Sequence, residues 1–484
     1  MPSRPSPRRT LLVLSLPALS FSLAQTMLVP AFGDLVKELH SNVATVTWLL
    51  TGYLVAAAVF TPLVGRLGDM FGKRRMLVVS LVAFAAGNVL SALGHDVGVV
   101  VAGRVVQGVA GGMFPLCFGI IRDELPVEKV AGSIGLVSAT IGIGGGAGLL
   151  LGGVMVDALG YSSIFWLGAG CSLVSVVMIA LLVPESPVRV PGKVDVRGAV
   201  VLSAALVLVL VAVSQGRSWG WGSARTVGTA GTGLVVLVLW VLLQQRTADP
   251  LVDMRTLASR AVLLTNSATL LVGFGMFGAF VLIPQLVEAP TSTGYGFGAS
   301  ATHAGLLMLP GSLGMLLFGP LSGALGSRYG HRFSLGLGCV LASFGMAMLA
   351  AFHGSDASVL GWFFVVSAGI GFAFAAMPNL IMGSVPRSQT GQATGFNAVV
   401  RSVGSSVGTQ VTAVVVVSSA AAGSLLPTNS GYVAAFAVCA VVAAVAAVVS
   451  FLVPKDGSHG HVQIGEEIGA AGLLPEPALA GDPA

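Results

Sequence analysis

Long apolar segments alternate with short polar loops along almost the whole chain. Most of these segments have about the 20 residues that a helix needs to cross a bilayer. Lipid offers the backbone no hydrogen-bond partners, so segments of this kind should be helical. We therefore predict an all-α integral membrane protein with 14 transmembrane helices, at about residues 11–32, 45–64, 76–94, 97–121, 130–156, 163–183, 198–214, 227–244, 261–283, 302–322, 333–352, 358–382, 391–420 and 431–453.

The composition agrees with a lipid environment. Of the 484 residues, 55% are hydrophobic and 9% are charged, whereas about a quarter of the residues in soluble domains are charged. The chain cannot cover itself with a polar surface, so we expect membrane lipids as partners and no nucleic acid. The sequence has no GxxxxGK[ST] pattern for ATP binding. We predict no enzyme activity, no cofactor and no metal site.

The 24 lysines and arginines indicate the orientation of the chain. Placing the loops alternately on two sides puts 19 bases on one side, three on the other and two within spans. Basic loops remain in the cytoplasm, so we predict a multi-pass plasma-membrane protein with both termini cytoplasmic. Residues 1–10 would form the N-terminus, and residues 454–484, rich in Gly, Pro and Ala, a disordered tail.

The chain contains an internal repeat. The stretch GRLGDMFGKRR at residues 65–75 has a weaker copy, GALGSRYGHR, at residues 323–332, which is an offset of 258. An offset of 260 aligns Gly111 with Gly371, Pro126 with Pro386, Gly135 with Gly395, Gly144 with Gly404 and Gly148 with Gly408. We predict two homologous six-helix halves, residues 11–183 and 261–453, with a linker and two inserted membrane helices at residues 184–260.

From about Thr10 to Val453, the chain resembles the major facilitator superfamily, and within it the fourteen-span drug:proton antiporters. The resemblance implies two pseudo-symmetric six-helix bundles with a two-helix insert. Such bundles expose a central substrate site to each side of the membrane in turn.

The stretch from Gly65 to Arg75 matches the superfamily's signature between spans two and three. The resemblance implies that Asp69 pairs with nearby bases and a helix N-terminus, and so latches the halves in the outward-open state. A plain basic loop is the alternative, but it explains neither the acid nor the glycines. Ser327 replaces the acid in the second copy, which should retain the turn without the charge. The predicted latch residues are Gly65, Asp69, Gly72, Lys73, Arg74 and Arg75.

Two arginines fall within apolar spans, where a charge costs roughly 2.5–3.5 kcal/mol on insertion scales. Arg104 belongs to GRVVQGVAGG, which resembles the superfamily's span-four motif, and the resemblance implies a role for Arg104 in proton transfer, with Gln107 beside it. Snorkelling of the side chain to the membrane surface is the alternative. Arg401 in span thirteen is a similar case.

Span five carries glycines at the spacing of the superfamily's antiporter motif: Gly135, Gly144, Gly148, Gly152 and Gly153. Small residues allow close helix packing, and tight packing alone is the alternative interpretation. The chain departs from the motif at Leu149, where the family has Pro. It also has Tyr161-Ser162-Ser163 in place of Trp-Arg-Trp.

The proton carrier is the least defined part of the prediction, because every acid falls in a loop or at a span end. Asp34 is our first choice, ahead of Glu38, Asp157 and Glu288, since burial in an outer vestibule could raise a carboxyl pKa. Ordinary solvated loop acids are the alternative. The predicted substrate-cavity residues are Gln25, Thr26, Asn266, Phe274, Met276, Asn379, Asn397 and Arg401.

These features predict a secondary active exporter of lipophilic drugs, antibiotics or secondary metabolites, including cationic ones, by proton antiport and alternating access. We expect it to function as a monomer, and the Ala-, Gly- and Arg-rich composition favours a bacterial source. The alternative is a proton-coupled symporter for a nutrient or metabolite. A membrane enzyme or receptor is a third possibility, for which the sequence offers no nucleophile–base pair or large soluble domain.

Overall fold

The structure, a computed structural model, describes residues 7–28, 31–41, 43–46, 48–186, 193–420 and 427–455. The predicted N-terminal segment 1–10 is described only from residue 7. Of the predicted tail 454–484, residues 456–484 lie outside the described residues. Every regular element in the described ranges is a helix.

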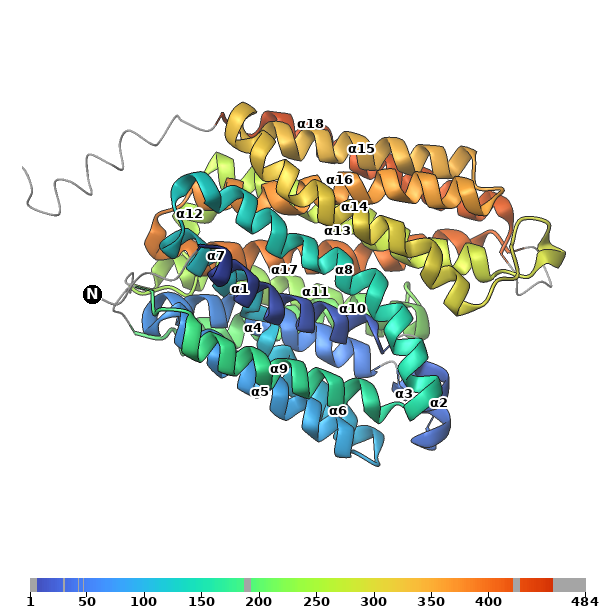
Figure 1. Ribbon diagram of the computed structural model, residues 1–484, viewed down its shortest axis with the longest axis horizontal. Coiled ribbons are helices and arrows are strands. Elements are labelled where there is room, and N and C mark those ends of the chain that lie inside the picture. Colours follow the sequence, from blue (N-terminus) through green and yellow to red (C-terminus); the bar gives the residue numbers. More distant parts are fainter. Residues whose placement is uncertain are drawn as a thin grey trace, which may run out of the picture.

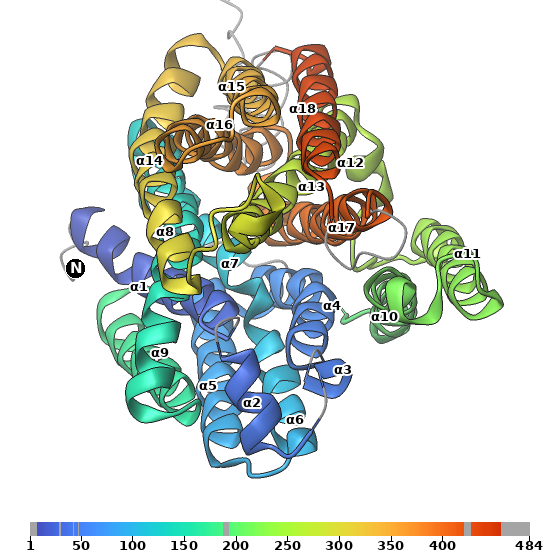
Figure 2. The ribbon, with the colours of Figure 1, turned by 90° about the vertical axis from the view of Figure 1, so that its right-hand side faces the viewer.

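The helices run mainly along one direction, lengthwise in Figure 1 and nearly end-on in Figure 2. The first group comprises α1 (Pro7–Thr26), α2 (Phe32–Glu38), α3 (Val43–Val46), α4 (Trp48–Phe71), α5 (Lys73–Leu93), α6 (Val97–Gln107), the 3-10 turn η1 (Gly108–Gly112), α7 (Met113–Glu124), α8 (Val127–Leu159) and α9 (Ser162–Leu182).

The second group begins after two helices that lie at the edge of the molecule in Figure 2, α10 (Val196–Trp219) and α11 (Ala224–Arg246). It comprises α12 (Met254–Ala258), α13 (Arg260–Glu288), η2 (Thr291–Thr293), α14 (Ala301–Tyr329), α15 (His331–Ala351), α16 (Asp356–Gly383), η3 (Arg387–Gln389), α17 (Thr390–Ser418) and α18 (Asn429–Leu452).

The helix count agrees with the predicted fourteen spans. Among the described residues, 13 helical segments are long and apolar enough to cross a membrane, and α6, η1 and α7 together form one of them. The remaining predicted span corresponds to α1, a helix of 20 residues that packs on α8 and α9. The chain therefore forms two six-helix bundles with a two-helix insert.

Several span limits differ from the sequence prediction: α4 continues to Phe71 and α14 to Tyr329, beyond the predicted ends at residues 64 and 322, so most of the stretch predicted as the loop after span two is helical. α1 ends at Thr26, so the predicted continuation of the first span to residue 32 is wrong. The sequence stays apolar beyond Thr26, which is why the prediction extended the span. However, Pro30 follows, and proline disfavours a helical conformation in the residue before it. Span four is interrupted by η1, where Gly111 approaches α4 so closely that a Cβ would lie 2.7 Å from Thr61 Oγ1.

The two most extensive contacts between the bundles are related to each other by the repeat. α4 packs on α17, and α14 packs on α8. A Cβ on Gly65 would lie 2.8 Å from the carbonyl carbon of Gly391, and a Cβ on Gly323 would lie 2.6 Å from that of Ala131. Because both partners are related by the sequence offset, the same close approach occurs twice, as expected for a pseudo-two-fold arrangement.

The insert is attached through α10. Thr51 and Ser214 share a hydrogen bond of 3.0 Å between their hydroxyl oxygens, which joins α4 to α10. Trp240 of α11 is buried and stacks on Phe396 of α17, with ring centroids 6.3 Å apart. α10 and α11 therefore flank the α4–α17 contact.

Tyr161 explains part of the departure from the family's Trp-Arg-Trp pattern. It lies in the turn between α8 and α9, and its hydroxyl donates a hydrogen bond of 2.8 Å to the Gly94 carbonyl in the turn after α5. Burial, with a smaller contribution from the Glu38 carboxylate, raises the pKa of this hydroxyl. The group therefore stays protonated as a donor and ties the two turns together.

Candidate functional site

A cavity of about 710 Å³ lies between the two bundles. Side chains from α1, α4 and α8 face others from α13, α14 and α17. Its lining is formed by Ser22, Gln25, Thr26, Leu50, Leu54, Ile141, Gly145, Leu149, Leu150, Gly153, Asp157, Met276, Phe277, Phe280, Val281, Pro284, Gln285, Glu288, Ala304, Gly305 and Thr409. We call the end of the molecule that carries Asp157 and Glu288 the cavity end.

Part of the predicted substrate set lines this cavity. Gln25, Thr26 and Met276 do, whereas Phe274 packs on the core of the second bundle. The Thr26 hydroxyl also donates a hydrogen bond of 2.6 Å to the Gly144 carbonyl, which joins α1 to α8.

The proton carrier that we placed first, Asp34, lies away from the cavity, whereas two of the carriers placed after it line the cavity. Asp34 does not line the cavity; it lies 3.8 Å from the Lys37 ammonium, and its side chain is 41% exposed. Asp157 of α8 and Glu288 of α13 do line the cavity, one from each bundle. The sequence could not reveal this, because it does not show which helix ends face the space between the bundles.

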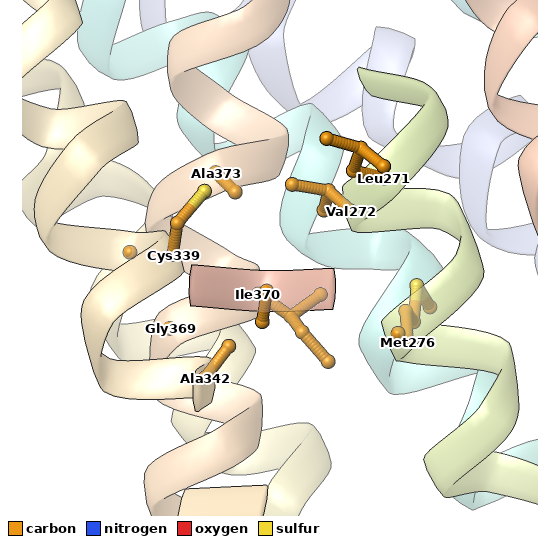
Figure 3. A pocket seen from close by; sticks show the side chains of 11 residues that line it. Leu271, Val272, Met276, Cys339, Ala342, Gly369, Ile370 and Ala373 are labelled. Atoms are coloured by element: carbon orange, nitrogen blue, oxygen red, sulfur yellow. The ribbon is translucent and has the colours of Figure 1, made fainter. Parts of the chain in front are cut away.

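A second, much smaller void of about 10 Å³ lies within the second bundle, between α13, α15, α16 and α18 (Figure 3). Its lining is apolar and includes Leu271, Cys339 and Ile370. A space of this size holds about one water molecule and needs polar partners to do so. It is a packing gap, and Met276 separates it from the large cavity because this side chain lines both.

Asp69 lies at the opposite end of the molecule, which we call the latch end. Its carboxylate accepts hydrogen bonds from the backbone N–H groups of Gly391 (3.2 Å) and Gln392 (3.1 Å), in the first turn of α17. The side chain is 1% exposed. The unpaired N–H groups of a helix N-terminus and its dipole both favour a carboxylate. The predicted residue thus contacts the predicted type of partner, across the two bundles.

Lys73 holds Asp69 and a second acid. Its ammonium lies 3.8 Å from Asp69 and 2.6 Å from the Asp123 carboxylate at the end of α7. Asp123 in turn accepts a hydrogen bond of 2.5 Å from the Ser186 hydroxyl. All three charged side chains are buried, so each depends on the others to compensate for lost solvation.

The other latch residues shape the turn between α4 and α5. Gly72 has φ +109°, a conformation that favours glycine. The Glu185 carboxylate accepts hydrogen bonds from the backbone N–H groups of Arg74 (3.1 Å) and Arg75 (3.2 Å). The Arg74 guanidinium donates to the carbonyl of Ala180 at the end of α9. This turn is therefore fixed to the last helix of its own bundle.

Arg122 provides a second link across the latch end. Its guanidinium donates hydrogen bonds to the Thr390 hydroxyl (2.6 Å) and to the carbonyls of Val385 (3.0 Å) and Pro386 (3.5 Å). Val385 and Pro386 lie between α16 and α17, and Thr390 is the first residue of α17, so the end of α7 in the first bundle binds the start of α17 in the second.

The repeat retains the turn and lacks the charge, as predicted. Gly330 has φ +91°, like Gly72, and Arg332 donates a hydrogen bond of 3.3 Å to the Val453 carbonyl at the end of α18. The Ser327 hydroxyl, however, donates to the Gly323 carbonyl of its own helix, at 2.9 Å. The second copy therefore anchors its turn without reaching the other bundle through this side chain.

Arg104 is buried within the first bundle and contacts uncharged acceptors. Its guanidinium donates hydrogen bonds to Gln107 Oε1 (2.7 Å) and to the carbonyls of Leu49 (3.1 Å) and Ala24 (3.2 Å). It also lies 4.1 Å above the Tyr53 ring. This depth and these contacts are incompatible with snorkelling, and they bring Gln107 to Arg104 as the sequence suggests.

The polar residues predicted in the second bundle mostly bind one another. Asn397 Nδ2 donates 2.8 Å hydrogen bonds to Asn266 Oδ1 and to the Thr269 hydroxyl. Asn379 donates to the Ala375 carbonyl (2.7 Å) within its own helix and to the Ala131 carbonyl (3.5 Å) of α8 in the other bundle. These asparagines therefore serve helix packing in this conformation, and none of the three lines the cavity.

Arg401 has a different environment. It lies near the middle of α17, with its guanidinium carbon 4.8 Å from the centre of the Phe374 ring on α16. Among the residues that the structure describes, none forms an ion pair with Arg401 or accepts a hydrogen bond from its side chain.

The glycines of α8 let neighbouring helices approach on two sides. A Cβ on Gly152 would lie 2.7 Å from Met27 Cα after α1, and a Cβ on Gly135 would lie 2.7 Å from the carbonyl carbon of Gly319 in α14. Gly144 and Gly148 face Ser22 and Thr26 of α1, while Gly153 lines the cavity. Leu149, at the family's proline position, also lines the cavity.

Comparison with known proteins identifies the family. Residues 14–409 match the sequence profile of the Major Facilitator Superfamily. The chain belongs to this superfamily. It is 28% identical over 420 residues to the tetracenomycin C resistance and export protein of Streptomyces glaucescens, covering 86% of this chain and 77% of that protein. It is 25% identical over 410 residues to multidrug resistance protein 3 of Bacillus subtilis, covering 84% and 79%.

A solved structure supports the same fold for this superfamily member. The human organic anion transporter MFSD10 (TETRAN) superposes with a TM-score of 0.67, at 16% sequence identity, over 93% of this chain and 100% of that chain. At this identity the likeness concerns the fold alone.

Three residues of the latch end were missed by sequence reasoning: Arg122, Asp123 and Glu185. Each had a usable signal, because each is a charged residue at a span end on the same predicted side as the basic stretch after Gly72. Asp123 and Glu185 are acids among many bases, and acids in such loops contribute little to orientation. In this superfamily member Asp123 instead compensates the charge of Lys73, and Glu185 positions the backbone of Arg74 and Arg75.

Proposed function

We propose that this protein is a secondary active exporter of lipophilic drugs, antibiotics or secondary metabolites, working by alternating access and proton antiport. The observation that carries the proposal is a cavity of about 710 Å³ between two bundles whose opposite end is closed by Asp69 on the N-terminus of α17. A central site closed on one side is what alternating access requires. The names of the two bacterial relatives support antibiotic and drug export.

We infer the orientation from the basic residues. The latch end, which carries the basic stretch after Gly72, would face the cytoplasm, and the cavity end would face outward in a bacterial plasma membrane. Both termini would then be cytoplasmic. The domain limits 11–183, 184–260 and 261–453 remain a proposal, as does function as a monomer.

The protons would reach the cavity from the outer side. Asp157 and Glu288 are the carboxylates placed to meet them, since both line the cavity. Arg104 and Gln107 would take part through their buried hydrogen-bonded group near α1 and α4. Asp34 is the weaker candidate, because its exposed carboxylate lies beside Lys37 outside the cavity.

Drug susceptibility in an efflux-deficient bacterial host tests the proposal. Cells that express the protein should survive higher concentrations of some lipophilic compounds and accumulate less of them, and a protonophore should abolish the difference. Unchanged susceptibility across a broad panel, or efflux that persists with the protonophore, would contradict it. Proton-dependent accumulation of a nutrient would favour the symporter alternative.

A further inference from the structure

Arg401 is a charged side chain for which the described residues provide no counter-ion. It lies on α17, within a segment long and apolar enough to cross the membrane. Its described contact is the face of Phe374, at 4.8 Å. A cation in such a position costs several kcal/mol unless it faces a cavity or a partner. The contact with one ring leaves the N–H donors of the guanidinium without acceptors among the described residues.

The internal repeat places Arg401 on the surface of α17 that faces the space between the bundles. The offset of 260, which relates the glycine contacts of α8 and α17, pairs Leu149 with Thr409 and Ile141 with Arg401. Leu149, Ile141 and Thr409 all line the cavity. Arg401 is therefore the fourth member of this set of repeat-related positions. It lies about two helical turns from Thr409 toward the latch end. Arg401 is not itself among the residues that line the cavity, so the repeat places it next to the inner end of the cavity, beyond Thr409.

We propose that Arg401 binds the anionic group of the transported compound, a carboxylate or ionised phenol on an aromatic framework, at the inner end of the cavity. A planar guanidinium pairs with such a group through two parallel hydrogen bonds. The cavity residues Phe277 and Phe280 offer apolar and aromatic surfaces to the rest of the compound, while the buried Phe374 ring lies behind the guanidinium. The inference rests on the proposed function and names the class of substrate.

The charges at the cavity end agree with this assignment. Asp157 and Glu288 lie there, and the described lining contains no basic residue. An anion is therefore repelled at the mouth and attracted toward Arg401 at the inner end, which opposes its return from outside. The sequence suggested that cationic compounds are included among the substrates; the unpaired cation at the inner end favours anionic ones.

Arg104 in the same protein has acceptors supplied by the chain for its Nε and Nη1, although its buried Nη2 has none among the described residues. It has three hydrogen-bond acceptors supplied by the chain, at 2.7–3.2 Å, in addition to the Tyr53 ring. Within the described part of the chain, the Arg401 guanidinium has the ring contact alone. The difference assigns a ligand-binding role to the second arginine and not to the first.

Equilibrium binding to the purified full-length protein in lipid nanodiscs tests the inference. The probe is 9-anthracenecarboxylate, with the uncharged 9-anthracenemethanol and the cation ethidium for comparison. The wild type should bind the carboxylate, and Arg401→Gln should weaken this binding at least about tenfold, as expected from losing charge-assisted hydrogen bonds. Arg401→Lys should restore part of it, and binding of the alcohol should be unchanged by either substitution.

Arg225→Gln is the matched control, because Arg225 also lies over an aromatic ring, 4.0 Å from that of Trp219, but outside the cavity. It should bind the carboxylate like the wild type. Equal affinity of wild type and a folded Arg401→Gln, or wild-type preference for the alcohol or ethidium, would overturn the inference. If Arg401→Gln does not fold, a folded Arg401→Lys protein decides the matter. Weakened affinity for the carboxylate, with wild-type affinity for the alcohol, supports the inference. Unchanged affinity for the carboxylate overturns it.

The outcomes also separate this inference from the proposed function. If export depends on the proton gradient but carboxylate binding does not change when Arg401 is substituted, the proposed function stands and the proposed anion site is wrong. If carboxylate binding requires Arg401 but cells show no export, the proposed anion site stands and the proposed exporter function is wrong.

Discussion

The carboxylate of Asp69 contacts groups from both bundles, which makes it sensitive to their relative position. Lys73 approaches it from the first bundle, and two backbone N–H groups of α17 approach it from the second. A carboxylate at a helix N-terminus contributes about 0.3–2 kcal/mol. This is enough to favour one conformation of a two-state transporter without preventing the other.

We predict that Asp69→Asn slows export while the protein still reaches the membrane. The amide keeps the size of the side chain but loses the charge that α17 and Lys73 stabilise, so the closed latch end should lose up to roughly 30-fold in relative population. Efflux rates in energised vesicles measure the effect. Ser327→Ala is the control and should export normally, since the Ser327 hydroxyl bonds its own helix; an Asp69→Asn protein as fast as the wild type would refute the latch.

The turn residues Gly72 and Gly330 should each be intolerant of a side chain. Both have positive φ, of +109° and +91°, where an L-residue costs about 1–2 kcal/mol. Alanine at either position should therefore lower the unfolding temperature in detergent, and Gly72→Ala more so because its Cβ would lie 2.7 Å from Glu185 Cδ. Gly354→Ala, a site with no atom within 4 Å of a Cβ, should have no such effect.

At the level of helices, α8 is packed from both sides through its glycines. It contacts α1 of its own bundle and α14 of the other. Glycines are suited to this role because they let backbones approach closely in lipid, where van der Waals packing drives helix association. The antiporter spacing read from the sequence thus coincides with positions where a side chain would collide with a neighbouring helix, and Gly153 is the member of the set that opens on the cavity.

We predict that Gly152→Leu impairs both stability and export. A side chain there would displace the backbone at Met27, at a cost of about 1–3 kcal/mol for overpacking. Thermal unfolding and efflux should both decline. Gly170→Leu on α9 is the matched control, because no atom lies within 4 Å of a Cβ at that glycine. Equal behaviour of the two variants would show that α1 and α8 need no close contact.

At the level of the whole molecule, the open cavity and the closed latch end lie at opposite ends. Three of the four native cysteines, Cys117, Cys339 and Cys439, are buried, and the partly exposed Cys171 is replaced by serine before labelling. Thr409→Cys, in the cavity, should react with a membrane-impermeant maleimide added outside the cell. Thr390→Cys, fully buried at the latch end, should not.

Asp69→Asn should reduce the labelling of Thr409→Cys, because weakening the latch end favours the opposite conformation. Labelling of Thr390→Cys from outside, or of Thr409→Cys only in inverted vesicles, would mean that the orientation or the conformation assigned here is wrong.

Much of this architecture could be predicted from the sequence because lipid imposes a simple length rule and because the repeat is visible in Gly65 and Gly323. The sequence could not predict whether an individual side chain faces a neighbouring helix or the cavity. Asn397 and Gln25 are both polar residues within spans, yet one bonds Asn266 and the other lines the cavity. A helix presents all its sides to some neighbour, and the sequence of a membrane helix does not distinguish a neighbouring helix from an aqueous space.

The start of α17 has a consequence for how the bundles separate. The 3-10 turn η3 precedes α17, so the amides of Gly391 and Gln392 lie in the first α-helical turn and are free to meet Asp69. By the repeat offset, their counterparts in α8 are Ala131 and Gly132, a full turn inside a helix that begins at Val127, where amides already have partners. An acid at residue 327 would find no docking point. We therefore expect closure to be one-sided, with the α4–α17 boundary parting first and the α8–α14 boundary, which lacks such a charged contact, acting as the pivot.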